Sequence, residues 1–211
     1  MAEVHGLTGY SEVASRFCEL SESIDFREIH GCILHLLPKP GAMVLDVGAG
    51  TGRDAAALAA MGHNVVAVEP MGQFLAEARA RHPSSKIRWV SGSLPGLREL
   101  PAELHQFDFV LCHAVWQHLS NGDRTEAMAR VATLLKPNGV FALGLRHGPP
   151  GAGTHYFPAG VAETVALAAT ANLAVELCLE DQLSALPNKT DVIWTRLAFR
   201  KRTALAPMTA V

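Results

Sequence analysis

The fold is decided by the stretch Val44-Leu45-Asp46-Val47-Gly48-Ala49-Gly50-Thr51-Gly52, in which an apolar strand runs through three alternate glycines into a helix. Glycine adopts backbone conformations that other residues avoid, and it lets a ligand lie against bare main chain. The N-terminus of the following helix adds free N–H donors aimed at the same point. The stretch therefore predicts a ligand-binding unit of strand, loop and helix.

A carboxylate follows the next apolar run. Glu69 ends the predicted strand 64–69, where a carboxylate can accept both hydroxyls of a ribose. Together the glycine loop and Glu69 predict an adenosine-containing ligand. The dinucleotide fingerprint is Gly-x-Gly-x-x-Gly, whereas here the third glycine comes one residue early and Arg53 stands where a small residue is needed. This spacing disfavours an NAD(P)-dependent oxidoreductase without excluding it.

From residue 42 onward, short apolar runs alternate with amphipathic stretches, as is typical of a parallel sheet covered by helices. We predict an α/β fold: a Rossmann-like, doubly wound, mostly parallel seven-stranded sheet flanked by helices, with a helical N-terminal appendage. Strands are expected at 42–47, 64–69, 86–91, 107–112, 140–145, 174–179 and 191–200, helices at 53–61, 71–81, 123–135 and 159–171, a turn at 137–139 and a loop at 148–158.

The first 40 residues carry a different pattern, with helical segments expected at 10–20 and 26–37 before Pro38-Lys39-Pro40. We therefore divide the chain into a helical cap or lid at 1–40, an α/β domain at 41–202 and a flexible tail at 203–211. The leading helices could cover an edge of the sheet or close over a ligand, and both alternatives stay open. A monomer and a homodimer are equally compatible with the sequence.

Composition excludes several classes of protein. Hydrophobic residues make up 49% of the 211, enough for one packed domain with a short appendage, and the net charge of -2 gives no support for nucleic-acid binding. No apolar stretch approaches the roughly 20 residues that span a bilayer, and the start lacks a secretion signal, so we expect a cytoplasmic protein. The four widely spaced cysteines predict neither a disulfide framework nor a zinc site.

In these motifs the chain resembles the class I S-adenosylmethionine-dependent methyltransferases. The similarity continues in Ser91-Gly92-Ser93, in the segment 107–119 and in the segment 134–139, in the family's order. The resemblance implies S-adenosylmethionine as cofactor, 41–202 as the domain that binds it, and methyl transfer by direct displacement to an acceptor that we expect to be a small molecule. By the same resemblance, the cofactor-binding residues are Asp46, Gly48, Ala49, Gly50, Gly52, Glu69, Met71, Ser93, Leu94 and His113.

The resemblance also implies individual roles. Asp46 and the backbone of the glycine loop would hold the methionine part of the cofactor, and Glu69 the ribose. Ser93 falls where the family usually carries an aspartate that receives the adenine amino group, and a hydroxyl accepts that hydrogen bond more weakly than a carboxylate does. Met71 and Leu94 would pack against the adenine ring.

Ionisable side chains follow the fourth and fifth predicted strands, where open α/β sheets bind their ligands. A histidine titrates near neutral pH and can remove a proton from an acceptor, and an arginine suits an anionic acceptor. A structural role for each stays open, as do His155 and Tyr156 in the loop beyond, and the histidines complete no metal-ligand pattern. The candidate catalytic residues are His113, His118, Arg146 and His147.

The alternative that differs most from an enzyme is a non-catalytic nucleotide-binding or regulatory module, which would keep the glycine loop and do no chemistry. The polar residues after the fourth and fifth strands favour an enzyme over this module.

Overall fold

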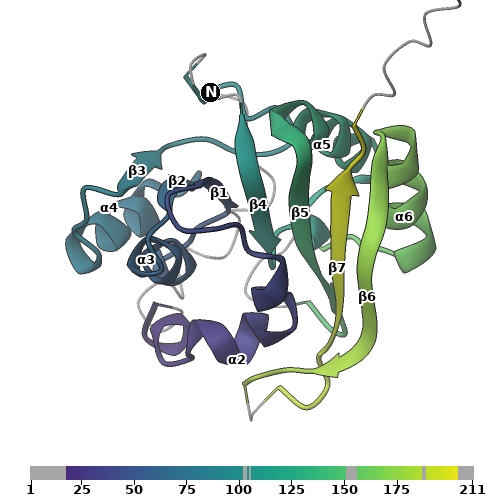
Figure 1. Ribbon diagram of the computed structural model, residues 1–211. Coiled ribbons are helices and arrows are strands. Elements are labelled where there is room, and N and C mark those ends of the chain that lie inside the picture. The colour runs from purple at the N-terminus through teal and green to yellow at the C-terminus, as the bar shows by residue number, and fades with distance from the viewer. Residues whose placement is uncertain (1–17, 102–103, 105, 151–155, 187–188, 204–211) are drawn as a thin grey trace, which may run out of the picture.

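The computed structural model describes residues 18–101, 104, 106–150, 156–186 and 189–203, and it contains a seven-stranded sheet with helices packed against it (Figure 1). The strand order is β3-β2-β1-β4-β5-β7-β6, and β7 runs antiparallel to both of its neighbours. This confirms the predicted Rossmann-like, mostly parallel sheet. The strands are β1 Met43–Val47, β2 Asn64–Val68, β3 Ile87–Val90, β4 Phe107–His113, β5 Leu135–His147, β6 Leu173–Leu183 and β7 Ile193–Lys201.

Helices pack on both faces of the sheet and enclose two apolar cores. One core lies between the sheet and α2, η2 and α3, and the other, larger core lies between the sheet and α5 and α6. Strands β1 and β4 are buried on both faces, as expected of central parallel strands. The helices are α2 Phe26–His30, α3 Arg53–Ala60, α4 Gly72–Arg81, α5 Asn121–Leu134 and α6 Val161–Thr170, with 3-10 turns η2 Gly31–Leu36 and η3 Trp116–His118.

Helix α5 starts and ends differently from the prediction. It begins before Asp123 because Ser120 is the N-cap: the Ser120 hydroxyl accepts the Asp123 N–H, and the Asp123 carboxylate accepts the Ser120 N–H. It ends at Leu134, since Leu135 already pairs with Phe107 as the first residue of β5. The expected turn at 137–139 is therefore an irregular stretch of β5, where the register with β4 shifts.

The last two strands form a long antiparallel pair. Strand β6 was expected to end at residue 179, but it continues to Leu183, which pairs with Ile193 at the start of β7. The polar residues 180–182 belong to this extension, where the register with β7 is irregular after Leu179. An edge strand exposed to solvent tolerates polar residues, and this explains the error.

The N-terminal segments are shorter than expected. The predicted helix 26–37 is divided into α2 and η2, because His30 leaves the helical region at φ -114° and Gly31, a poor helix former, follows it. Most of the predicted helix 10–20 lies outside the described residues, although 18–22 are helical. None of the described helices is long and apolar enough to cross a membrane.

Candidate active site

The glycine loop leaves β1 in a conformation that favours glycine at three positions. Gly48, Gly50 and Gly52 have φ values of 72°, 55° and 90°. A Cβ at Gly48 would lie 2.2 Å from a Val115 methyl group, and one at Gly52 would lie 2.5 Å from the ring of Trp89. Among the described residues, no atom lies within 4 Å of a Cβ at Gly50, so the described part of the chain leaves space in front of this glycine. Two of the glycines therefore serve close packing, and the middle one borders room for a ligand.

Glu69 lies directly beneath the loop and is 5% exposed. Its Oε2 accepts the Gly50 N–H at 2.9 Å, and its Oε1 accepts the Met71 N–H at 2.8 Å. Burial raises the pKa of this carboxyl, while the two backbone hydrogen bonds lower it. Glu69 thus holds the loop in shape, a role that the sequence did not reveal. An ionised carboxylate has about four lone-pair sites, so acceptor capacity remains for the two hydroxyls of a ribose.

Asp46 is the most exceptional side chain of the site, because it is 2% exposed and its Oδ2 has no hydrogen-bond partner among the described residues. Burial, and then the neighbouring Asp54, raise the pKa of Asp46 well above its ordinary value. A hydrogen bond with the Ala55 backbone lowers this pKa only in part. A buried carboxylate with one oxygen lacking a partner costs free energy in the absence of ligand. Its position beside the glycine loop fits a ligand that brings a cation, such as the ammonium group of a methionine moiety.

Residues from the N-terminal segment lie against the glycine loop. The Thr51 hydroxyl donates to Oε1 of Glu22, whose Oε2 lies 3.2 Å from Nε2 of His82. Arg53 donates from Nη1 to the Ser21 carbonyl oxygen at 2.9 Å. These contacts place residues 21 and 22 against the end of the glycine loop and the start of α3.

A buried ion-pair group connects α2 to α3. His30 Nε2 lies 3.0 Å from Asp54 Oδ2, and Arg53 Nε donates to Asp54 Oδ1 at 2.7 Å. Burial would raise the pKa of Asp54, but His30 and Arg53 together hold it far below its ordinary value. Arg53 therefore holds the Asp54 carboxylate in place next to the glycine loop. In the sequence, Arg53 served only as a residue too large for a dinucleotide-binding loop.

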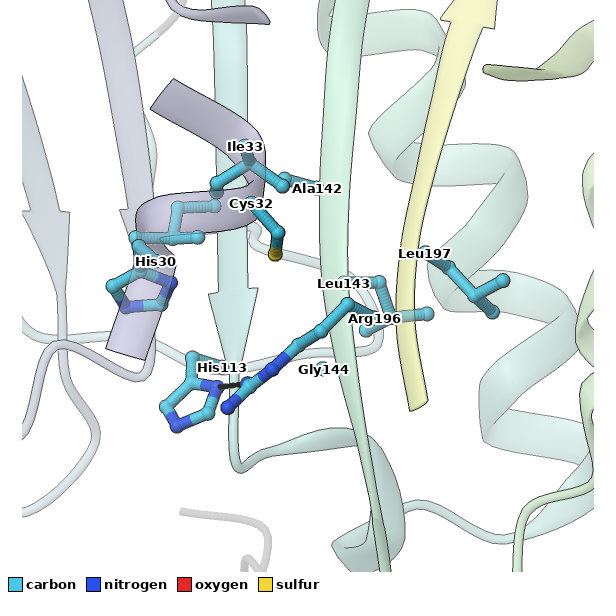
Figure 2. Close-up of a pocket in the computed structure, with 10 residues that line it drawn as sticks. His30, Cys32, Ile33, His113, Ala142, Leu143, Gly144, Arg196 and Leu197 are labelled. Carbon is cyan, nitrogen blue, oxygen red and sulfur yellow. Dashed lines mark hydrogen bonds between the residues drawn. The ribbon is translucent and has the colours of Figure 1, made fainter. Parts of the chain in front are cut away.

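His113, the last residue of β4, lines a narrow pocket under α2 and η2 (Figure 2). Its Nδ1 lies 2.9 Å from Nη1 of Arg196, its ring stacks on Trp194 with centroids 4.5 Å apart, and His30 meets it edge-on at 5.0 Å. Burial, and then the charge of Arg196, lower the pKa of His113 well below its ordinary value, so this imidazole is neutral at physiological pH.

Sequence reasoning missed Arg196. The available signal was a charged residue on the same face of the predicted strand 191–200 as Trp194 and Ala198, in an otherwise apolar setting.

The other candidate catalytic residues make contacts of their own. His147 hydrogen-bonds Thr195 at 2.9 Å, and alternation along β5 and β7 puts this pair on the opposite face of the sheet from His113. Arg146 donates to the Pro149 carbonyl oxygen. His118 ends η3, and its Nε2 lies 3.3 Å from the Gln117 side-chain nitrogen.

The remaining residues predicted to bind the cofactor, and the residues that could bind a metal ion, are placed as follows. Met71 and Leu94 are buried, with 9% and 5% of their surface exposed, and Ser93 is half-buried in the loop after β3. His155 lies outside the described residues. Within the described part of the chain, no three His, Cys, Asp or Glu side chains are grouped to hold a metal ion, and all four cysteines are free.

Comparison with known proteins agrees with this geometry. A family model described as a methyltransferase domain matches residues 44–139, from the glycine loop to the start of β5. The similarity to methyltransferase domains therefore lies in this part of the chain. The matched part contains the glycine loop, Asp46 and Glu69, the motifs on which the sequence resemblance rested.

Similar proteins are found by sequence and by structure. An uncharacterised methyltransferase of Mycobacterium tuberculosis is 34% identical over 108 residues, which cover 51% of this chain and 41% of the relative. A ubiquinone biosynthesis O-methyltransferase of Xanthomonas campestris is 32% identical over 114 residues, which cover 54% of this chain and 46% of the relative. The match thus spans less than half the length of these curated relatives.

Among solved structures, the fold is shared with the 1,6-didemethyltoxoflavin-N1-methyltransferase of Burkholderia thailandensis, which holds bound 1,6-didemethyltoxoflavin and S-adenosylhomocysteine. That protein is 23% identical, with a TM-score of 0.67, and the match covers 96% of this chain and 92% of that one. At this level of identity the similarity establishes the fold of the methyltransferase domain.

Proposed function

We propose that the protein is an S-adenosylmethionine-dependent methyltransferase that acts on a small-molecule acceptor. The observation that carries the proposal is the buried carboxylate of Asp46, whose Oδ2 has no hydrogen-bond partner among the described residues, on the strand that leads into the glycine loop. A fold kept only for structure would gain nothing from such a costly group. The names of the Xanthomonas and Burkholderia proteins support a small acceptor.

The proposed cofactor site follows from the loop and its surroundings. Asp46 would receive the ammonium group, Glu69 the ribose, and the apolar side chains of Met71 and Leu94 the adenine ring. Residues 1–40 would act as the cap, 41–202 as the catalytic domain and 203–211 as the tail. The full proposed set is Asp46, Gly48, Ala49, Gly50, Gly52, Glu69, Met71, Ser93, Leu94 and His113.

When bound, the cofactor supplies a methyl group on a sulfonium, which passes to the acceptor by direct displacement. The protein's part is to align the two reactants and to take a proton where the acceptor has one. Because an arginine N–H always donates, Nδ1 of His113 accepts from Arg196 and the proton of this neutral ring sits on Nε2. His113 is therefore a donor toward ligands, and His118 is the better candidate for the base. The cytoplasmic location and the oligomeric state stay predictions.

Replacing Glu69 by glutamine tests the cofactor site. A glutamine keeps the shape but can accept only through its single carbonyl oxygen, so the ribose and one loop N–H lose an acceptor. We expect S-adenosylhomocysteine to bind about 10- to 150-fold more weakly, as for the loss of charged hydrogen bonds worth about 1.5 to 3 kcal/mol. Calorimetric titration measures the change.

The matched control is Glu77→Gln, since Glu77 is 40% exposed on α4 and pairs with Arg81 near the surface. The affinity of Glu77→Gln for S-adenosylhomocysteine should equal that of the wild type. Unchanged affinity in a folded Glu69→Gln protein would show that the ribose site is elsewhere.

A further inference from the structure

Arg196 is a buried cation that pairs with no carboxylate among the described residues. It is 8% exposed, and the contact from Nη1 to His113 Nδ1 at 2.9 Å is the only hydrogen bond that its guanidinium makes within the described part of the chain. It also lies over the ring of Trp194, 4.9 Å from the centroid. Burial lowers the pKa of Arg196 to about 10, which still leaves it charged at neutral pH. Arginines are rarely buried to this extent without an anion.

The register of the adjacent strands β4, β5 and β7 brings Arg196 to His113. The register pairs His113 of β4 with Gly144 of β5, and Gly144 with Arg196 of β7, so the three lie in one row on one face of the sheet. A Cβ at Gly144 would lie 2.6 Å from His113 Nδ1 and 3.0 Å from Arg196 Nη1. The missing side chain lets the guanidinium reach across β5 toward β4.

None of the described residues that line the pocket in front of Arg196 carries a negative charge. His30, Cys32 and Ile33 cover it from α2 and η2 (Figure 2). Burial raises the pKa of Cys32, so its thiol is uncharged, and the nearby carboxylate of Asp54 is already paired with His30 and Arg53. The pocket has room for a group about the size of one water molecule, so only the end of a ligand enters it.

We propose that Arg196, together with His113, binds an oxyanion oxygen of the acceptor, so that the enzyme selects acceptors bearing a carboxylate or a comparable anionic group. This inference rests on the proposed methyltransferase function. The donor's own carboxylate is the other source of the same chemistry. It fits less well, because Asp46, which would hold the donor's ammonium group, lies on β1, whereas Arg196 belongs to β7, with β4 and β5 between these two strands.

The test uses benzoate and its neutral isostere benzamide as probes, titrated against the full chain saturated with S-adenosylhomocysteine. Benzoate should bind the wild type at least about tenfold more tightly than it binds Arg196→Met, as for a lost charged hydrogen bond. Arg196→Lys, which keeps the charge, should retain part of the affinity, and benzamide should not distinguish the variants. Arg200→Met is the matched control, because Arg200 lies on the same face of β7 but pairs with Glu176 near the surface.

Cys32 provides a second measurement on the wild type, which holds even if Arg196→Met fails to fold. Benzoate, but not benzamide, should slow the alkylation of Cys32 by a small neutral thiol reagent, as followed by mass spectrometry. The exposed Cys178 serves as the internal control. An unchanged Cys32 rate with bound benzoate would overturn the proposal.

The donor titration separates the remaining outcomes. Weaker S-adenosylhomocysteine binding by Arg196→Met, with unchanged binding of methylthioadenosine, which lacks the amino acid part, would assign Arg196 to the donor and overturn the inference. Intact S-adenosylhomocysteine binding without benzoate binding would overturn this inference alone. Failure of the wild type to bind S-adenosylhomocysteine would instead contradict the proposed function.

Discussion

Asp46→Asn is expected to leave the unliganded protein at least as stable as the wild type while weakening S-adenosylhomocysteine binding about 10- to 150-fold. The wild-type carboxylate is buried with an unpartnered oxygen, and an amide in its place removes the cost of burying a charge. The same change removes the counter-ion for the ligand's ammonium group. Urea unfolding gives the stability, and calorimetric titration gives the affinity.

Asp108→Asn is the matched control, with the opposite pattern expected. Asp108 Oδ2 accepts the Met43 N–H at 2.9 Å and lies 2.8 Å from the Lys136 ammonium, so its charge stabilises the fold. This variant should lose stability and keep its affinity for the ligand. A loss of stability in Asp46→Asn equal to that in Asp108→Asn would contradict a ligand-binding role for Asp46.

The pH dependence of these effects has a definite sign. The folded-state pKa of Asp46 is raised above its unfolded value near 3.8, so its contribution to stability is present below that value and is lost as the pH rises through the raised pKa. Ligand binding shows the reverse, because the ammonium group needs the ionised carboxylate. Affinity for S-adenosylhomocysteine should therefore fall as the pH drops through the raised pKa in the wild type. This component of the pH dependence should be missing from Asp46→Asn.

Arg124→Ala is expected to lower the free energy of unfolding by about 3 to 5 kcal/mol. Arg124 is fully buried in α5 and ties together the segments around the fourth and fifth strands. Its guanidinium donates to the carbonyl oxygens of Trp116, Phe157 and Pro158 and lies 3.3 Å from the Glu163 carboxylate. Alanine would leave these acceptors without a donor and create a cavity.

Chemical unfolding of Arg124→Ala beside Arg98→Ala measures this contribution. Arg98 is an arginine whose side chain is 86% exposed and whose pairing with Glu126, at 3.8 Å, is weak. Its removal should leave the unfolding free energy nearly unchanged. If the two variants unfold at similar urea concentrations, Arg124 does not hold the loop before α6 in place.

The glycine loop and the sheet were predictable because both are local patterns. Each of these patterns is a short segment of sequence: the alternate glycines, the acidic residue after β2, and the apolar runs. The structure confirms the strands that they predict. The start of α5 is also set by neighbouring residues, because Ser120 and Asp123 form a capping box. The sequence prediction placed the start of this helix at Asp123 instead of after Ser120.

The His113–Arg196 contact could not be read from the sequence. The two residues lie 83 positions apart in the sequence. Their contact depends on the register of β4, β5 and β7 and on the face of the sheet to which each side chain points. The hydrogen bond from Gly50 to Glu69 likewise needs the three-dimensional position of the loop. Histidines after the fourth and fifth strands looked like one cluster, but alternation along β5 separates His147 from His113.

The most direct test of the central claim is calorimetric titration of the full chain with S-adenosylmethionine, S-adenosylhomocysteine and NAD in parallel. We expect micromolar binding of the first two ligands and no heat from NAD, since the glycine spacing and Arg53 oppose a dinucleotide. Tight binding of NAD, or silence from all three ligands, would contradict the assignment of the glycine loop, Asp46 and Glu69 as a methyl-donor site.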